Sequence, residues 1–529
     1  MKRTLIILIV GTFLTISLGS AYAYHSHVGQ TGLLYLDKEK AYPGYNLFRG
    51  SMSDGTKVTF LTDLEGRVIN SWPCYGMPRF VDNGNIYDMG PGIDGKYGLI
   101  EMDWNGKVVW KWTIPEDRTD ILDAGNKAIH HQKQRIFNKA LNAYTNIVIS
   151  AKFLSHEDAL AAGGDPNKAR SDSSPDGIIE VDMAGNIIWE WSTMDHVIQD
   201  KFSDKPNYVG RGKKISDYPG KIDMNWGRGL RGDFVHFNSI DYNSTLGHIA
   251  VNNSFGSEFW IIDHQGSFIP NDPKGSNALA AGPAGDLLYR WGNPSRYGAG
   301  AEPSWEYGSS SLGDQQAFFT HSIQWIPEGL PGAGHFLYFD NNSLRPGTTF
   351  SRILEINPYD GPMKSGKYVP LMEAGFNYNH VSNQIAWSYQ SRDYTSFYSD
   401  YGSNMNRLPN GNTYVASSGG GQMFQVTSEG VLAWEYINPC SIEGVKKTII
   451  DPIPRDYNAS GFSVMYSKDH PALKGRDLTP TITITEMAAR GEFGGITGSR
   501  PPKPGEGGKG KKGRKGGKGK GGGGKGGKK

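Results

Sequence analysis

The sequence predicts an all-β protein, and more specifically a six-bladed β-propeller with inserted loops and a disordered basic C-terminal tail. The 529-residue chain holds 71 glycines and 12% aromatic residues, and its apolar residues lie in short runs rather than in long helical patterns. A strand–turn–strand motif also recurs along the chain. Many short aromatic or β-branched runs between glycine turns are typical of all-β folds. The predicted parts are a leader over 1–23, a propeller over 24–490 and a tail over 491–529.

The leader over 1–23 predicts a secretory signal peptide. Two basic residues precede an apolar run over 5–18, and the segment 21–23 is Ala-Tyr-Ala, a small-residue cleavage site. The apolar run is short for a bilayer span, which makes an uncleaved membrane anchor the weaker alternative. We therefore expect a secreted or periplasmic protein whose mature chain begins near Tyr24.

The C-terminal tail is strongly basic. Residues 500–529 carry 12 Lys and Arg against one acid, Glu506, whereas the whole chain has a net charge of only +2, so the body of the protein must be acidic. A Gly/Lys-rich segment cannot bury apolar surface and is expected to be disordered. It is either a solvated tail or an electrostatic tether to an anionic surface polymer or lipid, and no specific nucleic-acid partner is expected.

The recurring motif consists of a polar residue, two further residues, a glycine, an apolar pair and an aromatic residue. Each copy describes a strand, a tight turn and a second strand, which is the pattern of a β-hairpin. Clear copies begin at Asp63, Asp103 and Asp182, weaker ones at Asp263 and Asn357, and the last at Thr427.

A second pattern, an apolar residue followed within two positions by Asn-Gly-Asn, precedes several of these hairpins and is clearest over 81–86 and 408–413. Together the two patterns give four antiparallel strands per unit, which is the signature of a propeller blade. Inserted loops over 155–175, 192–230 and 268–285 are expected to build one face of the propeller. The predicted blades cover roughly 32–73, 76–113, 129–192, 233–292, 317–390 and 397–438.

The sequence leaves ring closure open. Either an early strand over 32–36 or a late strand over 481–487 could complete a blade. Cys74 and Cys440 follow the outer strands of the first and last blades, which are neighbours only if the ring closes. An oxidising compartment permits a disulfide between them, but equivalent positions on adjacent blades are usually too far apart for a direct bond.

Three histidines are predicted to lie at one height on the innermost strands. Counting five residues back from the apolar residue that opens each inner turn gives His131 and His321, and His236 fits with one residue of slippage. The same count gives Gly76 and Ser403 in two other blades. A single histidine would ordinarily cap a strand, but three in register in a chain with only 13 histidines indicate a site in the central channel.

The ligand predicted for these histidines is a small anion. A metal site is the alternative, but the matching positions hold no carboxylate and the sequence has no HxH or HExxH spacing. Arg345, at the end of the following strand, is expected at the same face, where a cation would be unfavourable beside a metal ion. Histidines combined with an arginine are better suited to an anion, and no metal is expected.

Six segments of the chain resemble the arylsulfotransferase family, the aryl-sulfate sulfotransferases, over roughly 30–480. The resemblance implies a six-bladed propeller that moves a sulfuryl group from a phenolic sulfate to a phenol through a sulfated histidine, with no nucleotide donor and no cofactor. It assigns His236 and His321 to the family's active-site histidines and Arg345 to its arginine. The segments are 236–243, 259–264, 287–294, 321–334, 407–412 and 475–480.

One position departs from the family pattern. The last blade's inner strand, where the resemblance implies the sulfated histidine, carries Ser403 and Asn404 instead. Either His321 or His236 is then the nucleophile, while a second imidazolium protonates the leaving oxygen and Arg345 holds the sulfuryl oxygens. The alternatives are a non-enzymatic propeller that binds sulfated or phenolic ligands and a metal-dependent hydrolase.

Further side chains are expected to contact a phenolic substrate. His131 belongs to the predicted ring of histidines, and Asn341 follows the same strand as Arg345. Trp325 and Tyr401 are candidates for the aromatic walls of a phenol pocket, although each is also an ordinary core residue type.

Overall fold

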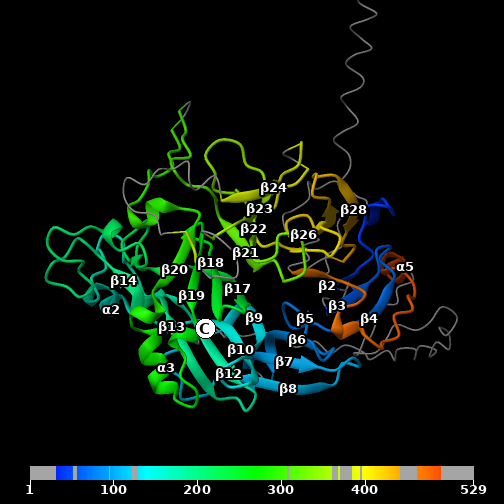
Figure 1. Cartoon of the computed structure of the whole chain (residues 1–529), viewed down its shortest axis with the longest axis horizontal. Helices are drawn as coiled ribbons and strands as arrows, with labels where there is room; N and C mark the ends of the chain where they lie inside the picture. Colours follow the sequence, from blue (N-terminus) through cyan, green and yellow to red (C-terminus); the bar gives the residue numbers. More distant parts are fainter. Residues whose placement is uncertain are drawn as a thin grey trace, which may run out of the picture.

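The structure, a computed structural model, is a six-bladed β-propeller and confirms the predicted fold (Figure 1). The predicted signal peptide over 1–23 and tail over 491–529 lie outside the described residues. Within the described ranges, no helix is long and apolar enough to cross a membrane. The structure describes residues 31–51, 56–93, 96–121, 129–306, 309–359, 367–369, 384–393, 396–440 and 462–489.

Each blade is an antiparallel sheet whose strands run in order from the innermost, at the channel, to the outermost, at the rim. Blade 1 consists of β29 (Ser463–Tyr466), β2 (Tyr45–Ser51), β3 (Lys57–Thr62) and β4 (Val68–Pro73). Blade 2 consists of β5 (Arg79–Phe80), β6 (Ile86–Ile93), β7 (Lys96–Met102) and β8 (Val108–Thr113). Blade 3 consists of β9 (Ile129–Asn138), β10 (Ala143–Ala151), β12 (Asp176–Asp182) and β13 (Ile187–Ser192).

The remaining blades follow the same order. Blade 4 consists of β17 (Phe237–Asn243), β18 (His248–Asn253), β19 (Glu258–Asp263) and β20 (Leu287–Trp291). Blade 5 consists of β21 (Thr320–Trp325), β22 (Phe336–Asp340), β23 (Arg352–Ile356) and β24 (Ile385–Tyr389). Blade 6 consists of β25 (Asn404–Arg407), β26 (Thr413–Ser417), β27 (Gln422–Val426), β28 (Leu432–Ile437) and β1 (Gly32–Leu36).

Both ends of the described chain close the ring. β1 is the outer, fifth strand of blade 6. The predicted boundary of blade 1 at residue 32, which placed this strand in blade 1, is therefore wrong. The inner strand of blade 1 is β29, so the proposal of a closing strand over 481–487 is wrong. Helix α5 (Ile484–Ala489) occupies most of that segment instead and lies beside β4 at the rim (Figure 1). Its start has a sequence signal, because Thr483 and Glu486 form a capping box with reciprocal bonds of 2.8 and 3.1 Å.

The tryptophans of the repeated motif bond one blade to the next. At five blade interfaces among the described residues, an outer-strand indole N–H donates to the hairpin turn of the following blade. Each such bond satisfies an indole donor and fixes the spacing of two sheets. The bonds join Trp72 to the carbonyl of Trp104, Trp112 to Gly185, Trp189 to the hydroxyl of Ser267, Trp387 to Ser428 and Trp434 to Leu64, at 2.7–3.1 Å.

The inner strands are joined around the channel by side-chain bonds to the neighbouring backbone. Asn404 of blade 6 donates to and accepts from the backbone of Ser463 in blade 1. Asn238 of blade 4 donates to the carbonyl of Thr320 in blade 5 at 2.9 Å. The second bond brings the first residues of β17 and β21 side by side. His236 directly precedes β17 and His321 is the second residue of β21, so the two histidines are brought to the same end of the channel.

The predicted loop insertions carry short elements of their own. α2 (His156–Ala161) lies in the first loop and α3 (Pro273–Ala280) in the third. The short strand pairs are β11 (Ser173–Ser174) with β16 (Gly232–Asp233) and β14 (Val197–Ile198) with β15 (Ile222–Asp223). The 3₁₀ helices of the described residues, not all of them in these loops, are η1 (Thr193–His196), η2 (Ile215–Asp217), η3 (Gln265–Ser267), η4 (Pro283–Gly285), η5 (Pro294–Tyr297) and η7 (Pro471–Leu473).

Cys74 and Cys440 are buried free thiols, so the disulfide is not formed in this structure. Cys440 packs against Gly50 of β2, whereas Cys74 follows β4, and β3 separates the two strands. Two strand spacings are about 10 Å, which exceeds the span of a disulfide. Burial raises the pKa of each thiol to about 12.

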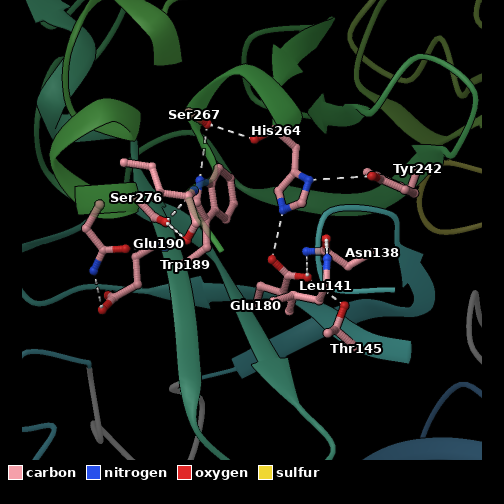
Figure 2. A network of polar contacts seen from close by, with 12 residues as sticks. Asn138, Leu141, Thr145, Glu180, Trp189, Glu190, Tyr242, His264, Ser267 and Ser276 are labelled. Atoms are coloured by element: carbon pink, nitrogen blue, oxygen red, sulfur yellow. Dashed lines mark hydrogen bonds and ion pairs between the residues drawn. The ribbon is translucent and has the colours of Figure 1, made fainter. Parts of the chain in front are cut away.

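A buried polar network joins blade 3 to blade 4 (Figure 2). The Glu180 carboxylate pairs with Nε2 of His264 at 2.8 Å, and both side chains are fully buried. The other carboxylate oxygen accepts from Asn138 at 2.9 Å and from Thr145 at 2.5 Å. Tyr242 lies against the opposite nitrogen of His264 at 3.5 Å. One carboxylate therefore satisfies three buried donors.

Replacement of Glu180 by alanine is expected to destabilise the protein by roughly 3 kcal/mol or more, because three buried donors lose their acceptor. The matched control is Glu190→Ala in the neighbouring strand β13. Glu190 is partly exposed and pairs with Arg118 at 2.8 Å, so its loss is expected to cost about 1 kcal/mol or less. Chemical denaturation of both variants measures the difference, and equal losses would contradict the role given to Glu180.

Candidate active site at the histidine end of the channel

Several inner strands have a residue with an unusual backbone at or just before their start. His131, His236 and Ser403 have φ angles of 56°, 55° and 83°, and Phe319 in blade 5 has 51°. Non-glycine residues rarely adopt this left-handed conformation, and it tends to occur at functional sites. The positions aligned by sequence are therefore equivalent in backbone conformation in blades 3, 4 and 6, and they lie at one end of the channel.

His131 forms a pair with a histidine that the sequence analysis did not single out. Its Nδ1 lies 2.7 Å from Nδ1 of His130, whose Nε2 lies 3.0 Å from a carboxylate oxygen of Asp176. An ionised carboxylate only accepts, so Nε2 of His130 carries the proton and its Nδ1 accepts from His131. In the neutral pair, the lone pair of His131 is thus on Nε2.

His236 is held by a carboxylate from its own loop. Its Nδ1 lies 2.5 Å from Asp233, and its ring lies 4.7 Å from that of His131. Burial disfavours the charged ring, but the hydrogen bond and charge of Asp233 together with the charge of Asp176 outweigh burial and raise the pKa of His236. His236 is therefore more readily protonated than an ordinary histidine, with Nε2–H as the proton that it can give away.

His321 has the opposite character. It is half-buried at the channel wall, and its Nδ1 lies 2.8 Å from the side-chain oxygen of Asn341. Burial lowers the pKa of His321 to about 3, and the charge of His236 lowers it further against the Asn341 hydrogen bond. His321 is therefore neutral at physiological pH, with a proton on Nδ1 and a lone pair on Nε2.

Stacked aromatic rings connect the two histidines. His236 stacks on Phe255 at 4.9 Å, Phe255 stacks on Phe319 at 6.2 Å, and Phe319 meets the edge of His321 at 5.6 Å. The bond between Asn238 and Thr320 joins the strands beside them. The structure thus brings His131, His236 and His321 to one end of the channel, as the sequence predicted.

A pocket of about 340 Å³ opens beside these rings. The guanidinium carbon of Arg228 lies 4.3 Å from the centre of the Phe255 ring, and Arg228 also donates to the carbonyl of Asp233. A phenyl ring fits such an aromatic pocket, and the cation at its rim suits an anionic substituent. The lining residues are Trp226, Arg228, Gly229, Phe234, Phe255, Arg296, Phe319 and Leu344.

Arg345 follows Leu344 of this pocket. It donates to the carbonyl of Thr348 at 3.0 Å, and its guanidinium carbon lies 5.3 Å from the centre of the Phe350 ring. These contacts hold it within its own loop after β22. Its assignment to the sulfuryl group stays a prediction, and Arg228 is a second candidate.

Two other predicted substrate contacts have different positions. Asn341 is fully buried, its oxygen faces His321, and its amide donates to the carbonyls of Ser399 and Gly402, so it positions His321 and has no polar atom left for a substrate. Trp325 is the last residue of the strand in which His321 is the second, about 13 Å away at the rise of a β-strand, and it lines a hollow at the other end of the channel.

Tyr401 and Ser403 belong to the loop that Asn341 holds. The carbonyl of Tyr401 accepts from Ser399 at 2.8 Å, and the assignment of its ring to a phenol wall stays a prediction. The Ser403 hydroxyl bonds to Ser399 at 2.9 Å and accepts from the backbone of Ser418 at 2.9 Å. A hydroxyl engaged in this way does not replace the missing histidine as a nucleophile.

The most important residues that sequence reasoning missed are the partners of the histidines. Asp233 stands three residues before His236, and the doublet of His130 and His131 is visible in the sequence. Asp176 and Arg228 have no such signal, because Asp176 reaches the site from the third strand of blade 3 and Arg228 from an inserted loop. No group of three or more His, Cys, Asp or Glu side chains arranged to hold a metal ion occurs in the described ranges.

No protein-family model matches the sequence, and no curated protein matches it. Among solved structures, the chain is similar to a Bacteroides caccae protein of unknown function, to apo AztD from Citrobacter koseri and to the WD40 domain of coronin from Toxoplasma gondii. Identities are 12%, 10% and 8%, TM-scores are 0.36, 0.33 and 0.33, and the matches cover 74%, 80% and 79% of this chain and 93%, 99% and 79% of the others. At these identities the similarity concerns the fold alone.

Proposed function

We propose that the protein is a sulfotransferase that moves a sulfuryl group from a phenolic sulfate to a phenolic acceptor through a sulfated histidine. The observation that carries the proposal is the pair of histidines on neighbouring blades whose pKa values are shifted in opposite directions beside an aromatic pocket. Two titratable groups with pKa values pushed apart are typical of an acid and a base or nucleophile in one site. The sequence resemblance to arylsulfotransferases leads to the same reaction.

In the first half-reaction, the Nε2 lone pair of His321 attacks the sulfur of the phenolic sulfate. An N–S bond forms while the S–O bond to the phenol breaks, and the leaving oxygen takes the Nε2 proton of His236. A phenol has an ordinary pKa of about 10, so protonation makes it a better leaving group. Asn341 keeps the His321 proton on Nδ1, which leaves Nε2 to react.

In the second half-reaction, an acceptor phenol gives its proton to His236 as its oxygen attacks the sulfur. The O–S bond forms, the N–S bond breaks, and both histidines return to their first protonation states. Arg228 at the pocket rim is suited to hold the sulfuryl oxygens, as cationic groups do in phosphoryl transfer. No nucleotide donor or metal is part of this scheme.

The proposal is tested by incubating the protein with 4-methylumbelliferyl sulfate, with and without a phenol acceptor, and with and without EDTA. Acceptor-dependent release of the fluorescent phenol that survives EDTA supports transfer. Hydrolysis that EDTA abolishes would favour a metal-dependent hydrolase and contradict the proposal. Mass spectrometry of the donor-treated protein is expected to show one added sulfuryl group on His321.

A second candidate is a propeller that binds phenolic sulfates without turning them over. It is favoured by one observation, the engaged Ser403 hydroxyl where the family pattern has a histidine. Binding of 4-methylumbelliferyl sulfate without release of the phenol or sulfation of the protein would support this function.

Asp233→Asn is expected to move the alkaline limb of the pH–rate profile for donor turnover to lower pH. His236 must be protonated to act as the acid, so activity falls as pH rises through its pKa, and Asp233 is what raises that pKa. The variant loses this support, so deprotonation occurs at lower pH. The control is Asp204→Asn in an exposed part of the inserted loop, and the profile is measured as kcat/KM against pH. An unchanged limb would rule out His236 as the acid.

A further inference from the structure

The end of the channel opposite the histidines holds two adjoining hollows of about 320 and 380 Å³. Arg79, Gln134 and Gln324 line both of them, so the two hollows share a wall. Gln324 stands near the end of β21 and Gln134 in the second half of β9, several residues beyond the histidines of the same strands. The hollows therefore form one concave mouth away from the candidate active site.

Arg79 is the centre of this mouth. Its guanidinium donates to the side-chain oxygen of Gln132 at 3.3 Å and stacks over the Phe462 ring at 4.6 Å. Among the ion pairs of the described residues, none involves Arg79, and burial lowers its pKa. The Asp241 carboxylate acts on Arg79 from a distance but forms no ion pair with it, which is unusual because a buried charge is normally paired.

Two further cations line the 320 Å³ hollow. Arg135 is neutralised by Glu101 at 2.7 Å, whereas the ammonium of Lys133 donates to the carbonyl of Met77 and lies 3.8 Å from its nearest carboxylate, that of Asp88. Both cations sit over the Tyr87 ring, at 5.2 and 5.4 Å. The smaller hollow is lined by three cations and one acid, Asp82, whereas the 380 Å³ hollow is lined by Arg79 and Asp241, so positive charge gathers in the smaller hollow.

The walls of the smaller hollow are aromatic and leave polar atoms without partners. The rings of Phe80, Tyr87, Tyr144 and Tyr466 line it. The buried side-chain oxygen of Gln134 and the buried hydroxyl of Tyr87 have no hydrogen-bond partner. Aromatic walls around an unpaired cation are the features of a site for a ring that carries a negative group.

We propose that this mouth is a second ligand site, distinct from the histidine end, that binds a small aromatic anion with its carboxylate or sulfate on Arg79 and its ring among the tyrosines. The inference does not rest on the proposed transfer reaction, because binding here involves neither His236 nor His321. The site is suited to an aromatic acid that is held intact.

The test is isothermal titration of the full-length protein with benzoate, acetate and benzylamine. Wild-type protein is expected to bind benzoate, to bind acetate more weakly and not to bind benzylamine. Arg79→Gln removes the charge and is expected to weaken benzoate binding by at least about tenfold, as loss of a charged hydrogen bond does. Arg79→Lys keeps the charge, and its affinity for benzoate is expected to lie between those of wild type and Arg79→Gln.

Two variants and a stability measurement locate the site. Lys107→Gln removes one positive charge from an exposed turn of the same blade, and His236→Ala alters the other end of the channel; both are expected to bind benzoate as wild type does. Thermal unfolding shows whether the Arg79 variants remain folded. Absence of benzoate binding to wild type, equal binding by folded Arg79→Gln, or loss of binding in His236→Ala would each overturn the proposal.

Discussion

Replacement of His321 by alanine is expected to reduce sulfuryl transfer by roughly 10⁴-fold or more, the loss typical of a covalent nucleophile. His321 is the histidine whose lone pair stays available at every pH above about 3, because burial disfavours its protonated form. The variant is also expected to lose the added sulfuryl mass after treatment with the donor. Both donor turnover and intact-protein mass are therefore measured.

A matched control for this variant lies in the same blade. His335 precedes β22 and pairs with Glu355 at 2.8 Å, at the end of the blade where β21 ends. His335→Ala removes a histidine from blade 5 without touching the candidate site, and it is expected to retain transfer. Added imidazole is expected to restore part of the donor turnover of His321→Ala, since it supplies the lost nucleophile. Transfer by His321→Ala at the wild-type rate would exclude His321 as the nucleophile.

Replacement of Arg228 by glutamine is expected to lower kcat/KM for the phenolic sulfate by about 10²-fold, the effect of losing one group that stabilises charge in the transition state. Arg228 lies over Phe255, which stacks on His236, so its charge is beside the expected position of the sulfuryl group. Because the charge on the sulfuryl oxygens is present before and during transfer, KM is expected to rise as well as kcat to fall.

The comparison with Arg345→Gln separates the two arginine candidates. Arg345 is bonded to Thr348 and stacked on Phe350, so its substitution is expected to change kcat/KM less than about threefold. If Arg345→Gln has the larger effect, the assignment drawn from the sequence resemblance holds and Arg228 is a residue of the pocket rim. The unfolding midpoints of both variants show whether a loss reflects folding.

The fold was predictable because its repeats are local. Each hairpin needs only a polar residue that caps the turn and a glycine with positive φ: the Asp63 carboxylate accepts from the backbone of Arg67 at 2.9 Å, and Gly66 has a φ of 76°. Among the described residues, Gly66, Gly106, Gly185 and Gly430 meet these requirements in blades 1, 2, 3 and 6, whereas the weaker copy in blade 4 forms η3 instead. Ring closure was harder to predict from the sequence, because β29 pairs with a strand about 400 residues earlier in the chain and no local pattern specifies that partner.

The candidate site was predictable only where it follows the inner strands. His131, His236 and His321 lie at matching points of three blades, so counting from the turns located them. Trp325 was placed with them although a six-residue strand separates the two ends of the channel. Asn341 was expected to contact substrate, and its bonds to two loop carbonyls, which fix its role as a support for His321, depend on a loop some 60 residues later.

The sequence by itself determined the number of blades, the inserted loops and the height of the histidines, because these depend on turn chemistry and strand alternation within short segments. Only the tertiary structure decided the chemical character of each histidine. Protonation depends on burial and on the charges and hydrogen-bond partners within a few ångströms. The carboxylates are Asp176 and Asp233 and the neutral partner is Asn341, and all three lie on separate elements. The same residue type is therefore made basic in blade 4 and kept neutral in blade 5 by neighbours that no local pattern specifies.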